Sequence, residues 1–144
     1  MSKMNPVVHF EMPAEDGKRM AEFYTNVFGW KAKQYGPEMG NYIVVQTTET
    51  DEKGMVKTPG AINGGFYQKT KDPVSNHPSV VIAVDDIYDT MKQVKESGGK
   101  VLGGGNPNKK SPEEPDNIPG VGLYSSFIDT EGNRVGVLQP LPME

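Results

Sequence analysis

A histidine and a glutamate near the start of the chain could do acid–base chemistry together. His9 and Glu11 stand two residues apart in the run Val7–Met12, which is otherwise apolar. Successive side chains of a β-strand point to opposite faces, so this pair would share one face and the apolar residues the other. Imidazole titrates near neutral pH, and a neighbouring carboxylate could act with it in proton transfer. The alternative is a histidine that is hydrogen-bonded in a polar cavity without doing chemistry, and both interpretations stay open.

The strand must feed a helix, because apolar residues recur after it with helical spacing. The stretch that starts at Glu15 is predicted to form this helix, and Gly29 is predicted to end it as a C-cap. We expect a buried apolar stripe made of Met20, Phe23, Tyr24, Val27 and Phe28.

Three further strands are predicted to complete a first βαβββ module. They are Trp30–Tyr35, Tyr42–Thr48 and Ala61–Tyr67, the last with paired glycines that indicate a bulge or a close approach to the backbone. After a polar, proline-containing linker over 68–78, the same order recurs. The second module begins with a strand at Ser79–Val84 and a helix over 87–97, for which Asp85-Asp86 is predicted to supply the N-cap. The helix is expected to bury Ile87, Tyr88, Met91 and Val94. A short strand at Lys100–Leu102 and a hairpin of 122–129 with 133–139 complete the module.

We therefore predict a single α+β domain over residues 1–144, with module one at 5–67 and module two at 79–140. The stretch from Gly103 to Val121 is long and rich in Gly, Pro and Asn. It is predicted to be either a plain insertion without regular structure or a lid over the site.

Composition excludes several function classes. The chain has 144 residues, a net charge of −4 and no cysteine. An acidic chain offers no electrostatic footprint for nucleic acid, and without cysteine there is no disulfide or thiol chemistry. No apolar run suits a signal peptide or a membrane helix. We expect a cytoplasmic protein with no nucleic-acid or membrane partner.

Several motifs together resemble those of a known superfamily. They are Val8-His9-Phe10, Phe23-Tyr24, Phe28-Gly29-Trp30, Val84-Asp85-Asp86 and the run 129–134. Together they resemble the vicinal oxygen chelate superfamily, which includes glyoxalase I, bleomycin-resistance proteins and extradiol dioxygenases. The resemblance covers nearly the whole chain and is greatest to its glyoxalase-like members. It implies two βαβββ modules that form a cupped, partly open barrel of mixed β-sheet with the helices outside.

The resemblance also implies where a divalent metal would be held. Two ligands come from each module, and the first-module positions match His9 and Gln46. The second-module positions match Ser79 and Gly136, which are a poor ligand for a transition metal and a residue with no side chain. His77 could replace Ser79 only if the register shifted by two residues.

From these losses we predict a protein that binds a small organic molecule in the cup without a tightly held metal. The predicted lining is His9, Glu11, Gln46, Ser79, Val81 and Arg134. Arg134 could bind an anionic group or, as a strand-end residue, reach solvent. His9 and Glu11 are the candidates for a catalytic role.

Two alternatives remain at this stage. The first is a metal-dependent lyase, isomerase or dioxygenase that uses His9 and Gln46, with Glu11 or His77 recruited as a further ligand. The second is a non-catalytic interaction module that acts as a dimer. A homodimer is expected under all three hypotheses, because superfamily members are commonly dimeric and symmetric dimers are the commonest oligomers.

Overall fold

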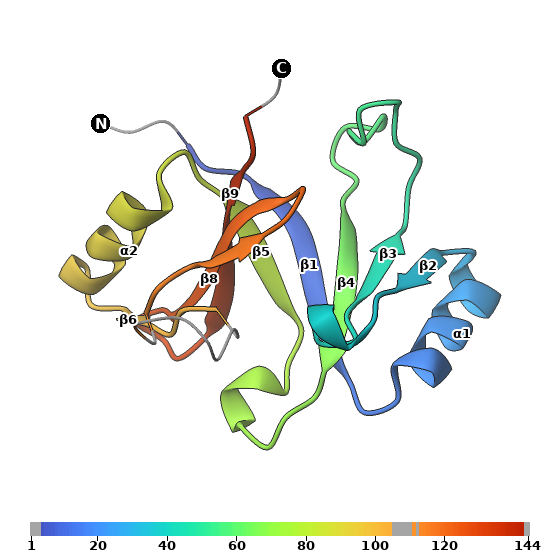
Figure 1. Ribbon diagram of the computed structural model, residues 1–144, viewed down its shortest axis with the longest axis horizontal. Coiled ribbons are helices and arrows are strands. Elements are labelled where there is room, and N and C mark those ends of the chain that lie inside the picture. The colour runs from blue at the N-terminus through green and yellow to red at the C-terminus, as the bar shows by residue number, and fades with distance from the viewer. Residues whose placement is uncertain (1–3, 105–110, 112, 143–144) are drawn as a thin grey trace. The chain divides into compact units, whose positions relative to one another are not determined.

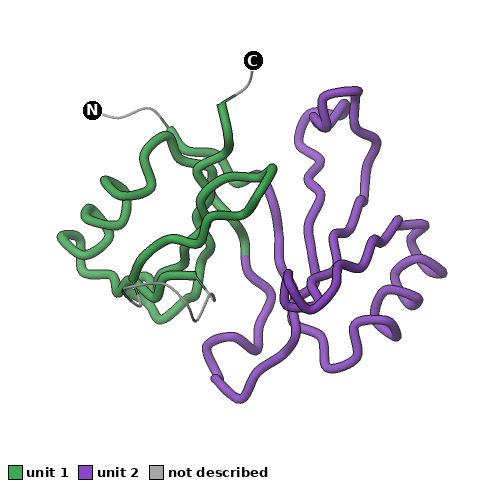
Figure 2. Tube along the Cα trace, viewed as in Figure 1, with its two compact units in different colours: residues 1–7, 80–144 green, residues 8–79 purple. Residues whose placement is uncertain are grey.

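The computed structural model describes residues 4–104, 111 and 113–142. The chain forms two compact units (Figure 2). We call residues 8–79 the N-terminal unit, and residues 4–7 together with 80–142 the C-terminal unit. Each unit carries one helix and a sheet of mixed strand direction, so the α+β class is confirmed.

The N-terminal unit has the predicted βαβββ order (Figure 1). Its elements are β1 (Val7–Ala14), α1 (Gly17–Phe28), β2 (Lys31–Gln34), β3 (Ile43–Gln46) and β4 (Asn63–Gln68), with a 3₁₀ turn at Pro37–Met39. The strands are ordered β2-β3-β4-β1, with β1 parallel to β4 and the other pairs antiparallel. Asp16 caps α1 by accepting a hydrogen bond from the Arg19 amide, and Gly29 ends the helix in the left-handed conformation at φ 74°.

The core of this unit lies between α1 and one face of the sheet. The buried residues of this cluster lie on the sheet and are Ala14, Ile43, Val45 and Phe66. Partly buried residues of β1, of α1 and of the turn after it pack against them: Phe10, Met12, Met20, Ala21, Tyr24 and Trp30. The rings of Tyr24 and Trp30 stack with centroids 4.7 Å apart and an angle of 10°. This packing fixes α1 on one face and leaves the other face of the sheet for other contacts.

The prediction of a fully buried stripe on α1 is wrong at three of its five positions. Phe23, Val27 and Phe28 are 56%, 57% and 59% exposed. The physical reason is that α1 packs on the core through Met20, Ala21 and Tyr24. Within the part of the chain that the structure describes, the other three side chains are left largely to solvent.

The C-terminal unit repeats the element order of the first. Its elements are β5 (Ser79–Ala83), α2 (Ile87–Glu96), β6 (Lys100–Val101), β7 (Asp116–Ile118), β8 (Gly122–Ile128) and β9 (Arg134–Pro140). A 3₁₀ turn at Pro73–Ser75, in the N-terminal unit, precedes β5. The strands are ordered β5-β9-β8-β6, and β7 pairs with β8. The core joins α2 to one sheet face through Val84, Ile87, Met91, Val101 and Val137. Among the described residues no helix is long and apolar enough to cross a membrane.

Two details of α2 bear on the sequence analysis. Asp86 is the predicted N-cap, because its carboxylate accepts hydrogen bonds from the amides of Tyr88 and Asp89 at 3.1 Å. The expectation that Tyr88 is buried is wrong, since 61% of it is exposed. Tyr88 is the second residue of the helix, and its neighbour Ile87 takes the buried direction with none of its surface exposed.

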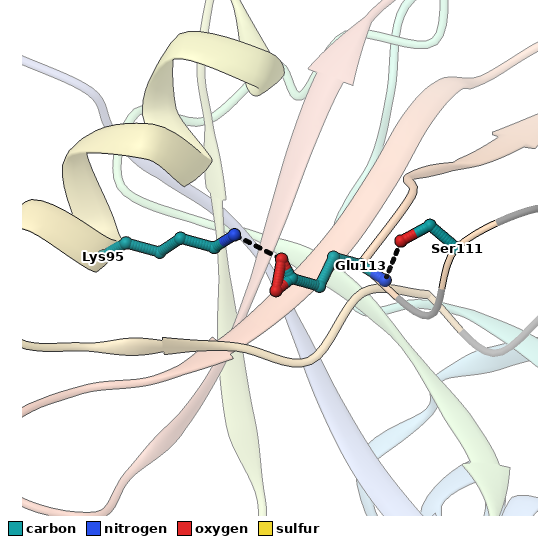
Figure 3. A network of polar contacts seen from close by, with 3 residues as sticks. All are labelled: Lys95, Ser111 and Glu113. Atoms are coloured by element: carbon teal, nitrogen blue, oxygen red, sulfur yellow. Dashed lines mark hydrogen bonds and ion pairs between the residues drawn. The ribbon is translucent and has the colours of Figure 1, made fainter.

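The segment between β6 and β8 is tied to the rest of its unit. The buried hydroxyl of Ser126 donates to the Gly103 carbonyl at 2.8 Å, and Asp116–Ile118 pairs with β8. Lys95 on α2 forms an ion pair with Glu113, whose amide donates to the Ser111 hydroxyl (Figure 3). The described part of the segment is thus not an insertion without regular structure, and its role as a lid stays a prediction; residues 105–110 and 112 lie outside the described residues.

Candidate functional site

The face of the N-terminal sheet opposite α1 carries the predicted site residues of this unit. Alternation along β1 turns Phe10 and Met12 toward the helix and His9 and Glu11 to the other side. We call this second side the open face. Glu11 is only 7% exposed, and His9 is partly buried.

Tyr42 joins the histidine to the glutamate. Its hydroxyl donates to Glu11 Oε2 at 3.0 Å, and His9 Nε2 lies 3.3 Å from the same hydroxyl oxygen. The two predicted residues are therefore linked through a third side chain, from a segment more than thirty positions further along the chain. Tyr42 is the functional candidate that sequence reasoning missed.

The paired glycines of β4 explain how Tyr42 reaches this position. Gly64 and Gly65 point to opposite faces, and a side chain at either would meet an aromatic ring. A Cβ at Gly64 would lie 2.5 Å from the Phe10 ring, and one at Gly65 would lie 1.9 Å from the Tyr42 hydroxyl. The predicted close approach to the backbone is thus confirmed, and it was the signal that a further side chain lies against β4.

The electrostatics of His9 favour a neutral ring. Burial lowers the pKa of the His9 imidazole below its ordinary value of 6.5, and the nearby Glu11 carboxylate offsets part of this effect by raising it. At neutral pH the imidazole therefore has one protonated and one unprotonated ring nitrogen, and it can accept a proton.

Gln46 lies on the open face in the same row as His9. His9 pairs with Asn63, and Gln46 follows Val45, which pairs with Gly64, so Gln46 is level with Asn63. Two strand spacings separate Gln46 from His9, about 10 Å between their backbones. The Asn63 side chain turns away from this row and accepts hydrogen bonds from the amides at 47 and 48 at 2.8 and 3.1 Å.

The C-terminal unit holds a matching arrangement of tyrosine and glycine. Glu11 pairs with Gly65 on β4, and in the same way Val81 pairs with Gly136 on β9. Tyr124 lies over Gly136 as Tyr42 lies over Gly65: a Cβ at Gly136 would be 2.9 Å from the Tyr124 hydroxyl. The predicted internal repeat therefore extends to individual residues.

Two residues of the C-terminal unit that are predicted to contact the ligand, Arg134 and Val81, lie near Tyr124 and Gly136. Arg134 lies two residues before Gly136, as Asn63 lies two before Gly65, and its Nη2 donates to the Tyr124 hydroxyl at 3.4 Å. Val81 is 2% exposed.

The remaining predicted residues lie near the start of β5. Ser79 begins that strand, and by the repeat it corresponds to His9, because it stands two residues before Val81. Its hydroxyl oxygen is buried and has no hydrogen-bond partner among the described residues. His77 is exposed, and its carbonyl accepts a hydrogen bond from Tyr67 at 3.3 Å.

Comparison with known proteins identifies the family. A sequence model of the bleomycin resistance protein-like N-terminal family matches residues 7–48. A glyoxylase-like domain-containing protein of Didymella fabae is 31% identical over 128 residues, which cover 85% of this chain and 84% of the relative. The chain belongs to the vicinal oxygen chelate superfamily. Within this superfamily it is glyoxalase-like, as its motifs predicted.

Solved structures of the superfamily share the fold over the full chain. Methylmalonyl-CoA epimerase in complex with methylmalonyl-CoA and NH4⁺ aligns with a TM-score of 0.66 and 13% identity, covering 99% of each chain. A hypothetical protein, BH1468, of Bacillus halodurans C-125 aligns with a TM-score of 0.63 and 14% identity, again over 99% of each.

The residues present do not fit the divalent metal that the superfamily implies. In the part of the chain that the structure describes, no three His, Asp or Glu side chains are grouped so that they could hold an ion. His9 Nε2 faces the Tyr42 hydroxyl. The repeat also makes Gly65, rather than Gln46 on β3, the counterpart of Gly136, so neither glycine position supplies a donor. A transition metal is usually held by about three protein ligands.

Proposed function

We propose that this vicinal oxygen chelate protein binds a small organic molecule on the open face of its N-terminal unit, at His9 and Gln46, without a tightly held metal. One observation carries the proposal: the buried carboxylate of Glu11 is linked to His9 through the Tyr42 hydroxyl. Val81 and Arg134, in the C-terminal unit, and Ser79, at the start of β5, stay predictions as ligand contacts.

The internal repeat supports a functional reason for this carboxylate. Taking a carboxylate out of water costs several kcal/mol unless it is well paired. Val81 fills the equivalent position in the C-terminal unit and is buried there, so the same fold accepts an apolar residue opposite the glycine. Stability alone therefore does not call for Glu11, whereas holding His9 in a defined orientation does.

The relatives support a small organic ligand. A glyoxylase-like protein matches most of the chain, and one solved structure of the same fold holds methylmalonyl-CoA. We infer that CoA thioesters and small keto and hydroxy acids are the compounds to test first.

The test is thermal unfolding in the presence of such a panel, with His9→Gln as the variant and His77→Gln as the matched control. His77 is the only other histidine of the chain and is exposed. A compound at 100 times its dissociation constant stabilises the folded protein by about 2.7 kcal/mol. For a chain of this size the midpoint rises by about 10 °C. We expect a shift that His9→Gln abolishes and His77→Gln retains; no shift with any compound would contradict the proposal.

The same assay with Mn²⁺, Fe²⁺, Co²⁺, Ni²⁺ and Zn²⁺ separates this proposal from a metal-dependent lyase, isomerase or dioxygenase. We expect a flat response to each ion, because His9 and Gln46 do not amount to the usual set of ligands. A comparable stabilisation by one ion, lost in His9→Gln, would replace the proposal with the metal-dependent alternative.

A further inference from the structure

We infer that Tyr42 is a positioning residue that places the proton of His9 on Nε2, so that the ligand meets His9 as an O–H or N–H donor to Nδ1. This inference rests on the proposed function, since it concerns the same open face. It adds the chemical class of the group that His9 recognises.

A count of hydrogens on the open face leads to this assignment. The carboxylate of Glu11 can only accept, so the single hydroxyl hydrogen of Tyr42 is used in the 3.0 Å contact with Glu11. The hydroxyl oxygen can then only accept at its other contact, 3.3 Å from His9 Nε2. Nε2 must therefore carry the hydrogen. A neutral imidazole has one N–H, so Nδ1 is left as the acceptor.

Tyr42 can fix which atom donates at each of these hydrogen bonds because its ring is held in place. The ring lies directly on Gly65, where any side chain would overlap both the hydroxyl oxygen and the ring carbons. Gly65 is opposite Glu11 in the parallel β1–β4 pair. The glycine against which the Tyr42 ring packs therefore lies beside the carboxylate that accepts the Tyr42 hydroxyl hydrogen.

The C-terminal unit has the same packing of a tyrosine on a glycine, but a different group contacts the tyrosine hydroxyl. Tyr124 lies on Gly136, but the residue opposite that glycine is Val81, and the group at the tyrosine hydroxyl is the Arg134 guanidinium, which donates. The tyrosine oxygen accepts in both units. In the N-terminal unit the Glu11 carboxylate fixes the direction of the hydroxyl hydrogen.

A ligand that suits this site offers a donor to a neutral imidazole. Hydroxyl, enol and amide groups meet this condition, whereas a metal ion bound at Nε2 would have to displace the Tyr42 hydroxyl. The lowered pKa of His9 is consistent with this, because burial keeps the ring neutral at pH 7.

The experiment is ¹⁵N NMR of the imidazole rings at pH 8 in the free protein. Only two histidines contribute, and His77→Gln assigns them. We expect Nε2 of His9 to be protonated in the wild type. In Glu11→Val, which copies Val81, the carboxylate no longer takes the Tyr42 hydrogen, so the Tyr42 hydroxyl need not accept from Nε2 and the fraction of His9 protonated on Nδ1 should rise. Tyr67→Phe is the matched control, because it removes a tyrosine hydroxyl that donates to the Ser75 carbonyl; it should leave the His9 tautomer unchanged.

Protonation of Nδ1 in the wild type, or retention of the Nε2 proton in Glu11→Val, would overturn the inference. If Glu11→Val does not fold, Tyr42→Phe replaces it, and we then expect His9 to show a mixture of tautomers in place of one. A single unchanged tautomer in Tyr42→Phe would also overturn the inference. Because no ligand or metal is present, the result is independent of the binding panel, and the inference and the proposed function fail separately.

Discussion

Replacing Gly65 by alanine tests the central contact of the open face. The new Cβ would lie 1.9, 2.2 and 2.4 Å from Oη, Cζ and Cε2 of Tyr42. Carbon atoms pack at about 3.5–4.0 Å, so the ring must move by more than about 1 Å. A shift of this size takes the 3.0 Å contact with Glu11 and the 3.3 Å contact with His9 beyond hydrogen-bond distance.

The expected cost follows from what Glu11 loses. A hydrogen bond to a charged group contributes about 1.5–3 kcal/mol, and the Glu11 carboxylate is buried. We therefore expect Gly65→Ala to lower the free energy of unfolding by about 2–3 kcal/mol. Urea denaturation measures the change as a lower midpoint at constant slope.

A double-mutant cycle with Tyr42→Ala separates this clash from a general intolerance of alanine in β4. The three atoms nearest to a Cβ at Gly65 all belong to Tyr42, so removing that ring removes the closest contacts, and alanine in a strand is otherwise favoured over glycine. The cost should fall to about zero, which gives a coupling energy of about 2 kcal/mol. Gly64→Ala is the matched control, because its Cβ would meet Phe10 on the other face and its cost should not depend on Tyr42. An equal cost of Gly65→Ala in both backgrounds would refute the reasoning.

Three further predictions concern stability. Because the pKa of folded His9 lies below 6.5, the unfolded chain binds more protons as the pH falls through 6.5; the free energy of unfolding should decline from pH 7 toward the lower, folded pKa, and His9→Gln should flatten this decline in urea titrations at successive pH values. Val27→Lys, at a position that is 57% exposed, should change stability by less than about 0.5 kcal/mol, whereas Phe66→Ala, at 1% exposed, should cost about 3–5 kcal/mol, as a pair of urea curves would show. Removing the cap of α2 in Asp86→Ala should cost about 1 kcal/mol, and a thermal midpoint unchanged from wild type would contradict that assignment.

The spacing of apolar residues, together with the residues typical of turns and helix caps, predicted most of the fold. The first helix, its end at Gly29 and the cap at Asp86 follow from local chemistry and are confirmed, although the helix begins at Gly17 rather than at Glu15. The burial of Phe23 and Phe28 could not be predicted in this way. Helical spacing tells which residues share a face, whereas burial also needs a partner surface, and α1 meets its partner surface through Met20, Ala21 and Tyr24.

The candidate site was predictable only in part, for a similar reason. The alternation of β1 placed His9 and Glu11 on one face without any tertiary information. Tyr42 directly precedes β3, and β4 lies between β3 and the strand β1 that carries the pair. The contact therefore depends on the register of β3 and β4, which a single sequence does not reveal. The paired glycines at 64 and 65 indicated a close approach, but not which side chain makes it.

The division of the chain into its two units has a consequence for the order of synthesis. Residues 8–79 are continuous, so every strand of the N-terminal unit is present before the second half of the chain is made. The C-terminal unit also includes residues 4–7, and the Pro6 carbonyl accepts a hydrogen bond from the Ala83 amide at 2.9 Å. Its strand β5 pairs with β9, which follows α2, β6, β7 and β8 in the chain. Residues 4–7 therefore wait for β9 before their unit can close, while His9, Glu11 and Tyr42 belong to the unit that can fold first.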